Sequence, residues 1–487
     1  MITCFLLSAQ NEDLKATTDE LLSSSVVSQI FIIGRELPSF NLPENAQWMK
    51  GDGFHDVKTI IMAAESSVSE YSLFYTKTSP LKTGPFGLER MVQIAQDTGA
   101  GMVYSDHYKM MNGKSVLHPL IDYQSGSLRD DFDFGSLLLY RTDAIKNVAP
   151  TLDKSWQYGG LYALRLAVSR IYSVFRIPEF LYTEMETDNR ASGEKIFDYV
   201  DPKNRAVQIE MEEICTANLK AIGGWLQPRF SEIDLSDSGF PVEASVIIPV
   251  RNRVKTIEDA IKSVLSQETK FPFNLIVVDN HSTDGTTELL QKMAESDEKL
   301  IHLIPDRNDL GIGGCWNYGV FHDACGKFAI QLDSDDLYIN NQVIQTIVEA
   351  FYEQQCAMVV GSYQMVNFNL KEIPPGLIDH REWTPENGRN NALRINGLGA
   401  PRAFYTPVLR EIRLPNTSYG EDYAVGLRIS RQYQIGRIYE PLYLCRRWEE
   451  NSDASLDVVK MNGHNLYKDR IRTIELQARI NLNKEIN

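Results

Sequence analysis

The sequence predicts an α/β protein of two tandem domains, each built on a mostly parallel sheet. In both halves of the chain, short apolar runs typical of strands alternate with segments that have the apolar spacing of helices. This alternation is typical of β-α-β units, whose strands lie parallel to one another. The length of 487 residues also exceeds what one hydrophobic core usually supports, so two or more domains are expected.

The first half contains the elements of one such domain. Its strands are compact apolar runs, and its helices carry apolar residues every three or four positions. The predicted strands span 3–7, 29–33, 71–75 and 101–104, and the predicted helices span 13–24, 57–64 and 88–97.

The second half repeats this order. Its first strand, 244–250 (ASVIIPV), is almost continuously apolar, as expected of a strand buried on both faces. The other predicted strands span 274–278, 300–304, 328–332 and 357–363, and the predicted helices span 255–267, 286–294, 315–324 and 342–352.

An internal repeat supports two copies of one domain. Residues 158–170 (YGGLYALRLAVSR) align with 419–431 (YGEDYAVGLRISR), with seven of thirteen positions identical, and 101–112 aligns loosely with 357–367. A chance match of helical segments is the alternative, and the shared element order argues against it. The predicted domains are 1–235 and 243–487, the second with a C-terminal helical segment, joined by the polar, turn-rich stretch 231–242.

The most informative stretch is KFAIQLDSDD, residues 327–336. A buried strand is predicted to end in three carboxylates, Asp333, Asp335 and Asp336. Carboxylates this close repel one another, and a divalent cation is the usual way to offset them. Oxygen ligands favour Mg²⁺ or Mn²⁺ over zinc, and ligands bind at the carboxyl ends of parallel strands. The alternative is a solvated acidic turn whose aspartates cap the next helix.

The first two strands of the second half also end in polar residues. The first ends in PVRNR, with Pro249, Val250 and Asn252, and the second ends at Asp279. A carboxylate at a strand end can accept hydrogen bonds from a nucleobase or ribose. Asp279 is alternatively a turn residue, but the segment 282–284 (STD) suits that role and would leave Asp279 for a ligand.

A glycine-rich turn follows in DRNDLGIGGCWNYGV, residues 306–320. It contains Asn308 and three glycines before a predicted helix, so its backbone amides can approach a phosphate or a sugar. Such a turn alone is weak support for a ligand site. Its position between the acids and the strand ends that suit a nucleotide strengthens the interpretation as a ligand site.

Taken in order, PVRN, VVDNHSTDGT, N-x-x-G with WNYG, LDSDD and GEDY resemble the family-2 glycosyltransferases of the GT-A fold, a Rossmann-like α/β fold. The resemblance covers about residues 243–450. It implies that Asp333 and Asp335 form the DxD pair that reaches the donor and its metal. It also implies that Asp422, beside Glu421, is the general base. The nucleotide-contacting positions implied are Pro249, Val250, Asn252, Asp279, Asn308, Gly311 and Asp333.

The function implied is that of an inverting glycosyltransferase that depends on Mg²⁺ or Mn²⁺. It would move a sugar from a UDP- or GDP-linked donor to a hydroxyl of a glycan or lipid-linked acceptor, in cell-surface polysaccharide synthesis. Two alternatives remain: a nucleotidyltransferase, which usually needs a lysine in its first loop, and a non-catalytic nucleotide-sugar-binding scaffold. Glu421 and Asp422 are alternatively no more than acids at a helix start.

One departure from the family pattern concerns the stretch CRRW, residues 445–448. Arg447 and Trp448 fit the Q-x-x-R-W pattern of processive synthases, but Leu444 replaces the glutamine. We therefore expect transfer of one or a few sugars, although Trp448 is equally well explained as a core residue.

The first copy lacks the acids of the second. LFYTKTS, residues 73–79, replaces IQLDSDD, and Gly160 and Leu161 replace the acidic pair. Lys77 would place a positive charge where a metal should sit, so we expect a catalytically silent domain. A cluster at Asp130, Asp131 and Asp133 is expected to be a solvated acidic loop rather than a rescued metal site.

Composition limits the partners and the location. With a formal net charge of −16, sequence-independent binding to nucleic acid is not expected. The six cysteines form no CxxC pair, which predicts reduced thiols and no zinc site. We find no apolar stretch of transmembrane length, and MITCFLL lacks the basic region of a signal peptide. The expected location is the cytoplasm, including the inner face of the membrane.

Overall fold

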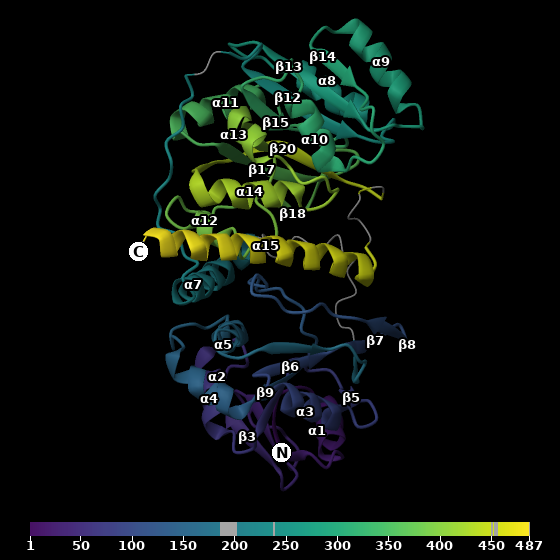
Figure 1. Cartoon of the computed structure of the whole chain (residues 1–487). Coiled ribbons are helices and arrows are strands. Elements are labelled where there is room, and N and C mark those ends of the chain that lie inside the picture. Colours follow the sequence, from purple (N-terminus) through teal and green to yellow (C-terminus); the bar gives the residue numbers. More distant parts are fainter. Residues whose placement is uncertain (186–201, 237–238, 450, 452–455, 487) are drawn as a thin grey trace. The chain divides into compact units, whose positions relative to one another are not determined.

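The computed structural model describes residues 1–185, 202–236, 239–449, 451 and 456–486 (Figure 1). The chain divides into two compact units. As far as the structure describes them, the first holds Met1–Ala191, Ala206–Gly224 and Leu456–Leu476, and the second holds Ser192–Arg205, Trp225–Ser455 and Gln477–Asn487. The predicted limits 1–235 and 243–487 follow the sequence repeat and remain a prediction. Residues 237–238 of the predicted joining stretch lie outside the residues that the structure describes.

The second unit contains a sheet in the order β14-β13-β12-β15-β19-β17-β20-β16, with β18 paired to β17. Its first four strands are parallel, because consecutive apolar strands are linked by helical crossovers. β19 then runs antiparallel between β15 and β17. The strands are β12 (Ala244–Val250), β13 (Phe273–Asp279), β14 (Leu300–Leu303), β15 (Phe328–Gln331), β16 (Leu337–Tyr338), β17 (Met358–Asn367), β18 (Glu372–Ile378), β19 (Arg402–Tyr405) and β20 (Ile435–Arg447).

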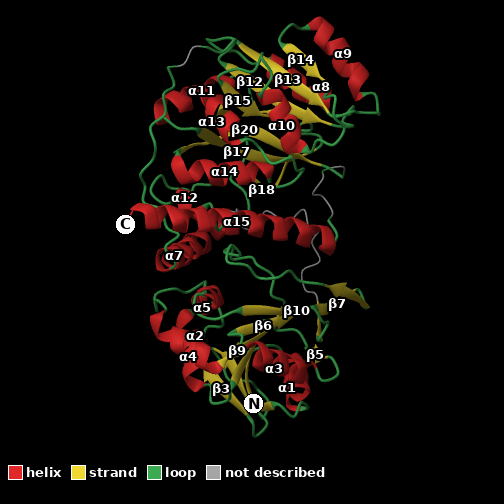
Figure 2. Ribbon diagram, viewed as in Figure 1, coloured by secondary structure: helices red, strands yellow, loops and turns green. Residues whose placement is uncertain are grey.

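Amphipathic helices cover this sheet (Figure 2). In α8 the buried residues are Ile257, Ala260, Ile261 and Val264, one face of a helix. α10 packs on β12 and β13, and α11 packs on β17 and β20. The helices are α8 (Ile257–Leu265), α9 (Thr286–Ser296), α10 (Ile312–Val320), α11 (Val343–Gln354), α12 (Gly388–Asn391), α13 (Thr406–Ile412), α14 (Glu421–Gln432) and the last turns of α15 (Val458–Ile486).

The first unit contains a sheet in the order β10-β6-β9-β4-β1-β2-β3 and a small sheet in the order β5-β11-β7-β8. The strands are β1 (Ile2–Leu7), β2 (Val27–Gly34), β3 (Ala46–Lys50), β4 (Tyr71–Tyr75), β5 (Lys82–Thr83), β6 (Met102–Ser105), β7 (His107–Met111), β8 (Lys114–His118), β9 (Leu137–Arg141), β10 (Val174–Ile177) and β11 (Tyr182–Met185). The helices are α1 (Asn11–Leu22), α2 (Val57–Ser66), α3 (Gly87–Thr98), α4 (Thr142–Val148), α5 (Gly160–Ser169) and α7 (Arg205–Ala221).

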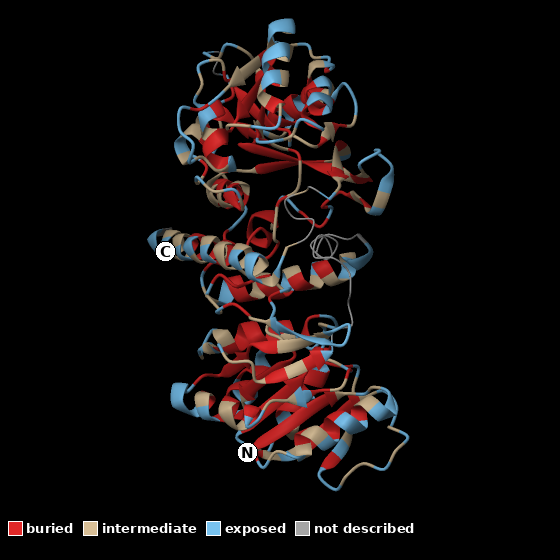
Figure 3. Cartoon of the chain, turned by 90° about the vertical axis from the view of Figure 1, so that its right-hand side faces the viewer, coloured by how far each residue is buried: buried red, intermediate tan, exposed pale blue. Residues whose placement is uncertain are grey.

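The large sheets of the two units have the same order and strand directions. β3-β2-β1-β4-β9-β6-β10 corresponds to β14-β13-β12-β15-β19-β17-β20, and in both the strand after the centre is antiparallel. The central strands of both sheets are buried (Figure 3). The prediction of two tandem α/β domains with mostly parallel sheets is therefore confirmed.

Some predicted elements differ in detail. The helix predicted at 315–324 spans Ile312–Val320, because its glycines belong to the first turn. The antiparallel strands β9 and β19 were not predicted, since short strands of this kind are defined by tertiary pairing more than by their own pattern. Among the described residues, we find no helix with both the length and the apolarity needed to cross a membrane.

Candidate active site

Three carboxylates follow β15 in the second unit. Asp333 is exposed, Asp335 is half-buried and Asp336 is buried. The aspartates do not cap the next helix, because α11 begins at Val343 after Gln342, so the capping role of that alternative is not observed. Asp336 instead accepts a hydrogen bond from the backbone amide of Arg446 at 2.7 Å, which ties the turn to β20.

Asp335 lies at the meeting point of three side chains. Its Oδ2 accepts hydrogen bonds from Trp448 Nε1 at 3.2 Å and Asn451 Nδ2 at 3.1 Å. The guanidinium of Arg253, in the turn after β12, approaches the same oxygen at 4.0 Å. Trp448, which the sequence left between a site role and a core role, therefore contacts the acidic cluster directly.

The packed strand end disfavours three ionised carboxylates. Desolvation by the surrounding chain and the charges of Asp335 and Asp333 raise the pKa of Asp336 well above its usual range. Desolvation also raises the pKa of Asp333, against the opposite effects of Arg402 and Gln331. A bound cation would reverse both effects, since it favours ionised carboxylates.

A chain of hydrogen bonds connects this strand end to the start of α14. Gln331 is buried; its Nε2 donates to Asp333 Oδ1 at 2.8 Å, and its Oε1 accepts from the amide of Arg402 at 3.1 Å. Arg402, the first residue of β19, places Nη1 2.6 Å from Asp422 Oδ2. The two predicted groups of acids are therefore brought together, and Gln331 and Arg402 link them.

Glu421 and Asp422 occupy the first two positions of α14, after Gly420 with φ 76°. Asp422 is half-buried and faces Arg402. Glu421 is only 8% exposed, and its Oε2 has no hydrogen-bond partner among the described residues. Burial and the neighbouring Asp422 raise the pKa of Glu421 to about 8, so Glu421 is largely protonated at neutral pH.

The predicted nucleotide-contacting residues surround the carboxyl ends of β12 and β13. Pro249 and Val250 end β12, and the Val250 carbonyl accepts from the amide of Asn280 at 2.8 Å. Asn252 has a left-handed φ of 54°, and its Oδ1 accepts from the amide of Thr283 at 2.8 Å. Its side chain thus fixes the turn after β13, beside the strand ends where a ligand would bind.

Asp279 is engaged within the chain rather than left open for a ligand. It is fully buried and accepts from the Ser282 amide at 3.0 Å and from Thr287 Oγ1 at 2.5 Å, with His302 Nε2 at 3.4 Å. Burial raises its pKa, but these hydrogen bonds outweigh that effect and lower the pKa of Asp279 to about 2. Asp279 itself therefore accepts the hydrogen bonds of the turn, contrary to the expectation that residues 282–284 leave it free for a ligand.

The glycine-rich turn is also used differently from the sequence expectation. The amide of Gly311 donates to Asn416 Oδ1 at 2.7 Å, and that of Gly313 donates to the Thr417 carbonyl at 2.9 Å. A Cβ at Gly311 would lie 2.6 Å from the Thr417 carbonyl carbon. These glycines therefore let the loop before α14 approach α10. Asn308 lies in the exposed turn before them.

The corresponding place in the first unit is filled. Gly160, at the position of Glu421, donates its amide to the His55 carbonyl at 2.7 Å, and a Cβ there would lie 2.5 Å from the Phe54 carbonyl oxygen. A side chain does not fit at this point. The acids of the predicted loop are paired, since Asp131 lies 2.9 Å from Arg129 and Asp133 lies 2.8 Å from His118.

The residues of the second unit fit a metal shared with a substrate. Among the described residues, no three His, Cys, Asp or Glu side chains form a metal site by themselves. Mg²⁺ is commonly held by one or two carboxylates and completed by water and substrate phosphates. Exposed Asp333 and half-buried Asp335, in a cluster with unfavourable negative charge, suit this arrangement.

Sequence reasoning missed Gln331, Arg402 and Arg446. Gln331 interrupts an otherwise apolar run, and this polar residue in a buried strand indicated a hydrogen-bonding role inside the sheet. Arg446 is buried, yet it donates to the Asp335 carbonyl at 2.7 Å and to Asp259 Oδ2 at 3.2 Å. Its role in the site depends on pairing between β16 and β20, which local sequence does not reveal.

An α/β unit with carboxylates at the end of a central strand and at the start of a helix linked to it suits the binding of a nucleotide at the strand ends. Comparison with known proteins identifies the family. The sequence model of Glycosyl transferase family 2 matches residues 245–410. The glucosyltransferase WfgD of Escherichia coli is 31% identical over 201 residues, which cover 40% of this chain and 72% of WfgD. The chain belongs to glycosyl transferase family 2.

Other similar proteins match over smaller parts. An uncharacterised glycosyltransferase of Rickettsia felis is 30% identical over 206 residues, 42% of this chain and 33% of its own length. The match therefore spans about a third of that relative. Crystalline TarS 1-349 of S. aureus with UDP-GlcNAc is 22% identical, with a TM-score of 0.37 over 49% of this chain and 72% of that one.

Proposed function

We propose that this glycosyltransferase is inverting and metal-dependent, and that it takes its sugar from a UDP- or GDP-linked donor. One observation carries the proposal: Gln331 and Arg402 join Asp333, at the strand end, to Asp422, at the start of α14. The donor-side carboxylate and the candidate base are therefore linked through two residues. Direct displacement at an anomeric carbon needs groups on both sides of the reacting carbon.

The proposed donor site lies at the carboxyl ends of β12, β13 and β15. Asn252 and the turn after Asp279 would contact the nucleoside, and Asp333 and Asp335 would hold Mg²⁺ or Mn²⁺. When bound, the cation supplies charge neutralisation for the departing diphosphate. Pro249, Val250, Asn308 and Gly311 are proposed to shape the same pocket.

The proposed base is Asp422. Its carboxylate would accept the proton of the acceptor hydroxyl while that oxygen forms a bond to the anomeric carbon. The bond from the anomeric carbon to the diphosphate oxygen breaks, and the nucleoside diphosphate leaves with the electron pair. Attack from the opposite face inverts the anomeric configuration. The N-terminus of α14 favours the ionised form of the base.

The acceptor proposed is a glycan or a lipid-linked sugar in cell-surface polysaccharide synthesis. The name of the Escherichia coli relative states a sugar linked to diphosphoundecaprenol as its acceptor. We propose the cytoplasmic face of the membrane as the place of reaction. The first unit, whose position equivalent to Glu421 is closed, is proposed to be catalytically silent and to hold an acceptor glycan or a partner protein.

The test combines binding and turnover on the full-length protein. Calorimetry with UDP and GDP in the presence of Mn²⁺ would be paired with hydrolysis and transfer assays over a panel of nucleotide sugars. We expect Mn²⁺-dependent binding of one nucleotide and slow hydrolysis of its cognate sugar donor. Binding without turnover of any donor would favour a nucleotide-sugar-binding scaffold instead.

A further inference from the structure

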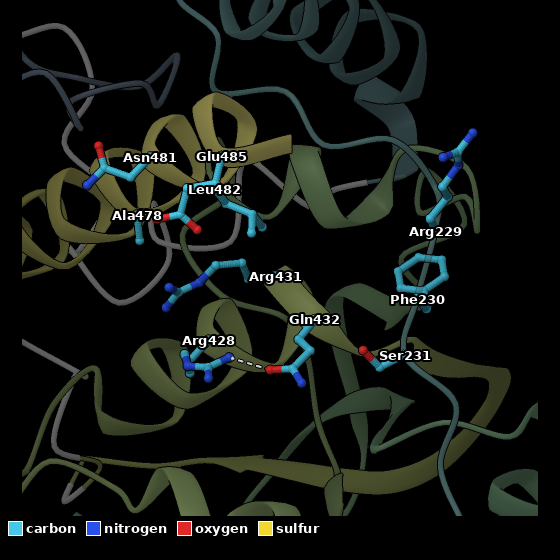
Figure 4. Close-up of a pocket in the computed structure, with 10 residues that line it drawn as sticks. All are labelled: Arg229, Phe230, Ser231, Arg428, Arg431, Gln432, Ala478, Asn481, Leu482 and Glu485. Atoms are coloured by element: carbon cyan, nitrogen blue, oxygen red, sulfur yellow. Dashed lines mark hydrogen bonds between the residues drawn. The ribbon is translucent and has the colours of Figure 1, made fainter. Parts of the chain in front are cut away.

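A cavity of about 740 Å³ lies in the second unit, at the end of α14 opposite to Glu421 (Figure 4). Residues from three segments line it: the last turns of α14, the last turns of α15 and the extended segment 229–231. A volume of this size is typical of sites for small molecules. It exceeds what a single phosphate ion needs.

The lining is strongly basic for an acidic protein. The full chain has a formal net charge of −16, yet three arginines line the cavity, Arg229, Arg428 and Arg431, against one carboxylate, Glu485. Arg428 and Arg431 are three residues apart, so they lie on one face of α14. Planar guanidinium groups match the paired oxygens of phosphates and carboxylates.

The rest of the lining suits a sugar. The hydroxyl of Ser231 and the amide of Asn481 offer donors and acceptors of hydrogen bonds, although Asn481 Oδ1 already accepts from Gln477 Nε2 at 2.9 Å. The amide of Gln432 is engaged in the wall, since its Oε1 accepts from Arg428 Nη1 at 3.3 Å and its Nε2 donates to the Tyr433 hydroxyl at 3.2 Å (Figure 4). Phe230 adds an apolar ring face on which the C–H groups of a sugar ring can pack. Ala478 and Leu482 add apolar surface, so the lining mixes cations, amides and apolar groups, unlike the almost wholly apolar lining of a lipid site.

Buried groups hold the walls of the cavity in place. Arg389, 4% exposed, donates to the carbonyls of Arg229, at 2.7 Å, and of Arg431, and its guanidinium lies 4.5 Å from the centre of the Phe230 ring. The amide of Ser231 donates to the Gln432 carbonyl at 2.9 Å. The segment 229–231 is therefore fixed against α14 without any ligand.

On α15, the second wall is fixed in the same way. Arg479 is fully buried and donates to Ser430 Oγ at 2.9 Å, and Asn483 Nδ2 donates to the Trp225 carbonyl at 2.8 Å. These contacts orient the face of the helix that carries Asn481 and Glu485 toward the cavity. A cavity with such walls is preorganised, which lowers the ordering cost of binding.

The cavity is separate from the proposed transferase site. α14 carries Glu421 and Asp422 at its first turn and Arg428 to Gln432 at its last. Arg428 and Arg431 follow Asp422 by six and nine residues, which at about 1.5 Å each places them roughly 9 and 14 Å from the candidate base along the axis. A ligand in the cavity would therefore not be the donor diphosphate.

A purely structural account explains only part of the arginine cluster. A cation in the last turn of a helix interacts favourably with its exposed carbonyls, which accounts for Arg431. Arg229 comes from a different segment and lies outside the helix, so this effect does not explain it. We propose that the cavity binds an anionic saccharide, a sugar carrying a phosphate or a carboxylate, at a second site outside the transferase centre.

The test is a titration of the full-length protein in the presence of a chelator, followed by calorimetry or ligand-observed NMR. The probes are glucose 1-phosphate, glucuronate, orthophosphate and glucose. We expect glucose 1-phosphate or glucuronate to bind at least about tenfold more tightly than orthophosphate or glucose, and the preferred one identifies the anion. Equal affinity for orthophosphate, or binding of none of the probes, would overturn the proposal.

Variants assign the binding to the cavity. Arg428→Gln with Arg431→Gln should weaken the preferred probe at least about tenfold, and Arg229→Gln, in an exposed segment, should weaken it without disturbing a helix. The control Lys262→Gln with Lys270→Gln removes two exposed charges and should leave affinity unchanged. Asp335→Ala should also leave it unchanged. Binding that survives all three arginine substitutions, or disappears in Asp335→Ala, contradicts the assignment.

Discussion

Arg402 Nη1 lies 2.6 Å from Asp422 Oδ2, so the candidate base is held by a guanidinium that also lies close enough to Asp333 for their charges to interact. The Arg402 amide is in turn fixed by Gln331, which hydrogen-bonds Asp333. The orientation of the base thus depends on the same residues that contact the donor-side acid. Binding of a donor at Asp333 would therefore affect the orientation of Asp422 through Gln331 and Arg402.

We therefore predict that Arg402→Gln lowers kcat by about 10-fold or more, because Asp422 loses its fixed orientation. Loss of the nearby positive charge also makes Asp422 a stronger proton acceptor, so the acidic limb of the pH–rate profile should move to higher pH. Arg402→Lys keeps the positive charge but not the planar guanidinium, so its kcat should lie between those of the wild type and Arg402→Gln. Unchanged kcat and pH profile in Arg402→Gln would show that the ion pair has no part in catalysis.

Replacement of the base gives a sharper effect. Asp422→Asn should retain donor binding and lose transfer by about 10²-fold or more, the usual effect of a positioned general base. Calorimetry with the nucleotide and initial-rate assays separate the two quantities. If transfer persists within a few-fold, Asp422 is only an acid at a helix start, and Glu421→Gln becomes the next variant to examine.

The metal ligands are tested at Asp335. Asp335→Ala should abolish the divalent-dependent part of nucleotide binding, measured by calorimetry with and without Mn²⁺. Because Asp335 also accepts from Trp448 and Asn451, Asp335→Asn is the matched variant, since its amide oxygen keeps an acceptor there. Both variants should lose metal dependence, and Asp335→Asn should do so with an unchanged melting temperature in the absence of metal. Metal-dependent activity that persists in both excludes Asp335 as a ligand.

The acidic residues of the site were predictable because local sequence patterns indicate them. Asp333 and Asp335 follow an apolar strand, and Glu421 and Asp422 follow a glycine at a helix start, so residue type and spacing pointed to them. The hydrogen bond between Gln331 and Arg402 spans 71 residues and depends on β19 running antiparallel to β15. The spacing of residues in the sequence does not reveal such a contact.

The fold follows the same division. The parallel strands and their helices were predicted because apolar periodicity is a local property. The glycines of the 311–314 turn were visible too, but their use was not, since the loop that fills the space beside them comes from residues 415–418. Asp279 likewise accepts a hydrogen bond from the Ser282 amide in a turn that residues 282–284 alone were expected to stabilise.

Glu421 should give the protein a pH-dependent stability. Its pKa in the folded chain, about 8, is above the ordinary 4.5, so the folded state binds the extra proton between these values. Its contribution to stability is fully present below about pH 4.5 and is lost as pH rises toward 8. Glu421→Gln should reduce the fall in the free energy of unfolding between pH 5 and 9 by about 1.4 kcal/mol or more, the equivalent of one pKa unit. Urea unfolding at both pH values measures it, and an equal fall in both proteins contradicts it.

The last prediction concerns the first unit. Its strand end at Tyr75 is followed by Lys77 instead of acids, and the Phe54 carbonyl oxygen occupies the place of a side chain at Gly160. We expect one nucleotide site per full-length chain in a titration with Mn²⁺, and none in the double variant Asp333→Ala with Asp335→Ala. Lys77→Gln, the matched control, should leave the single site unchanged. A second saturable, Mn²⁺-dependent site that remains in the double variant would make the first unit a nucleotide-binding domain and the protein bifunctional.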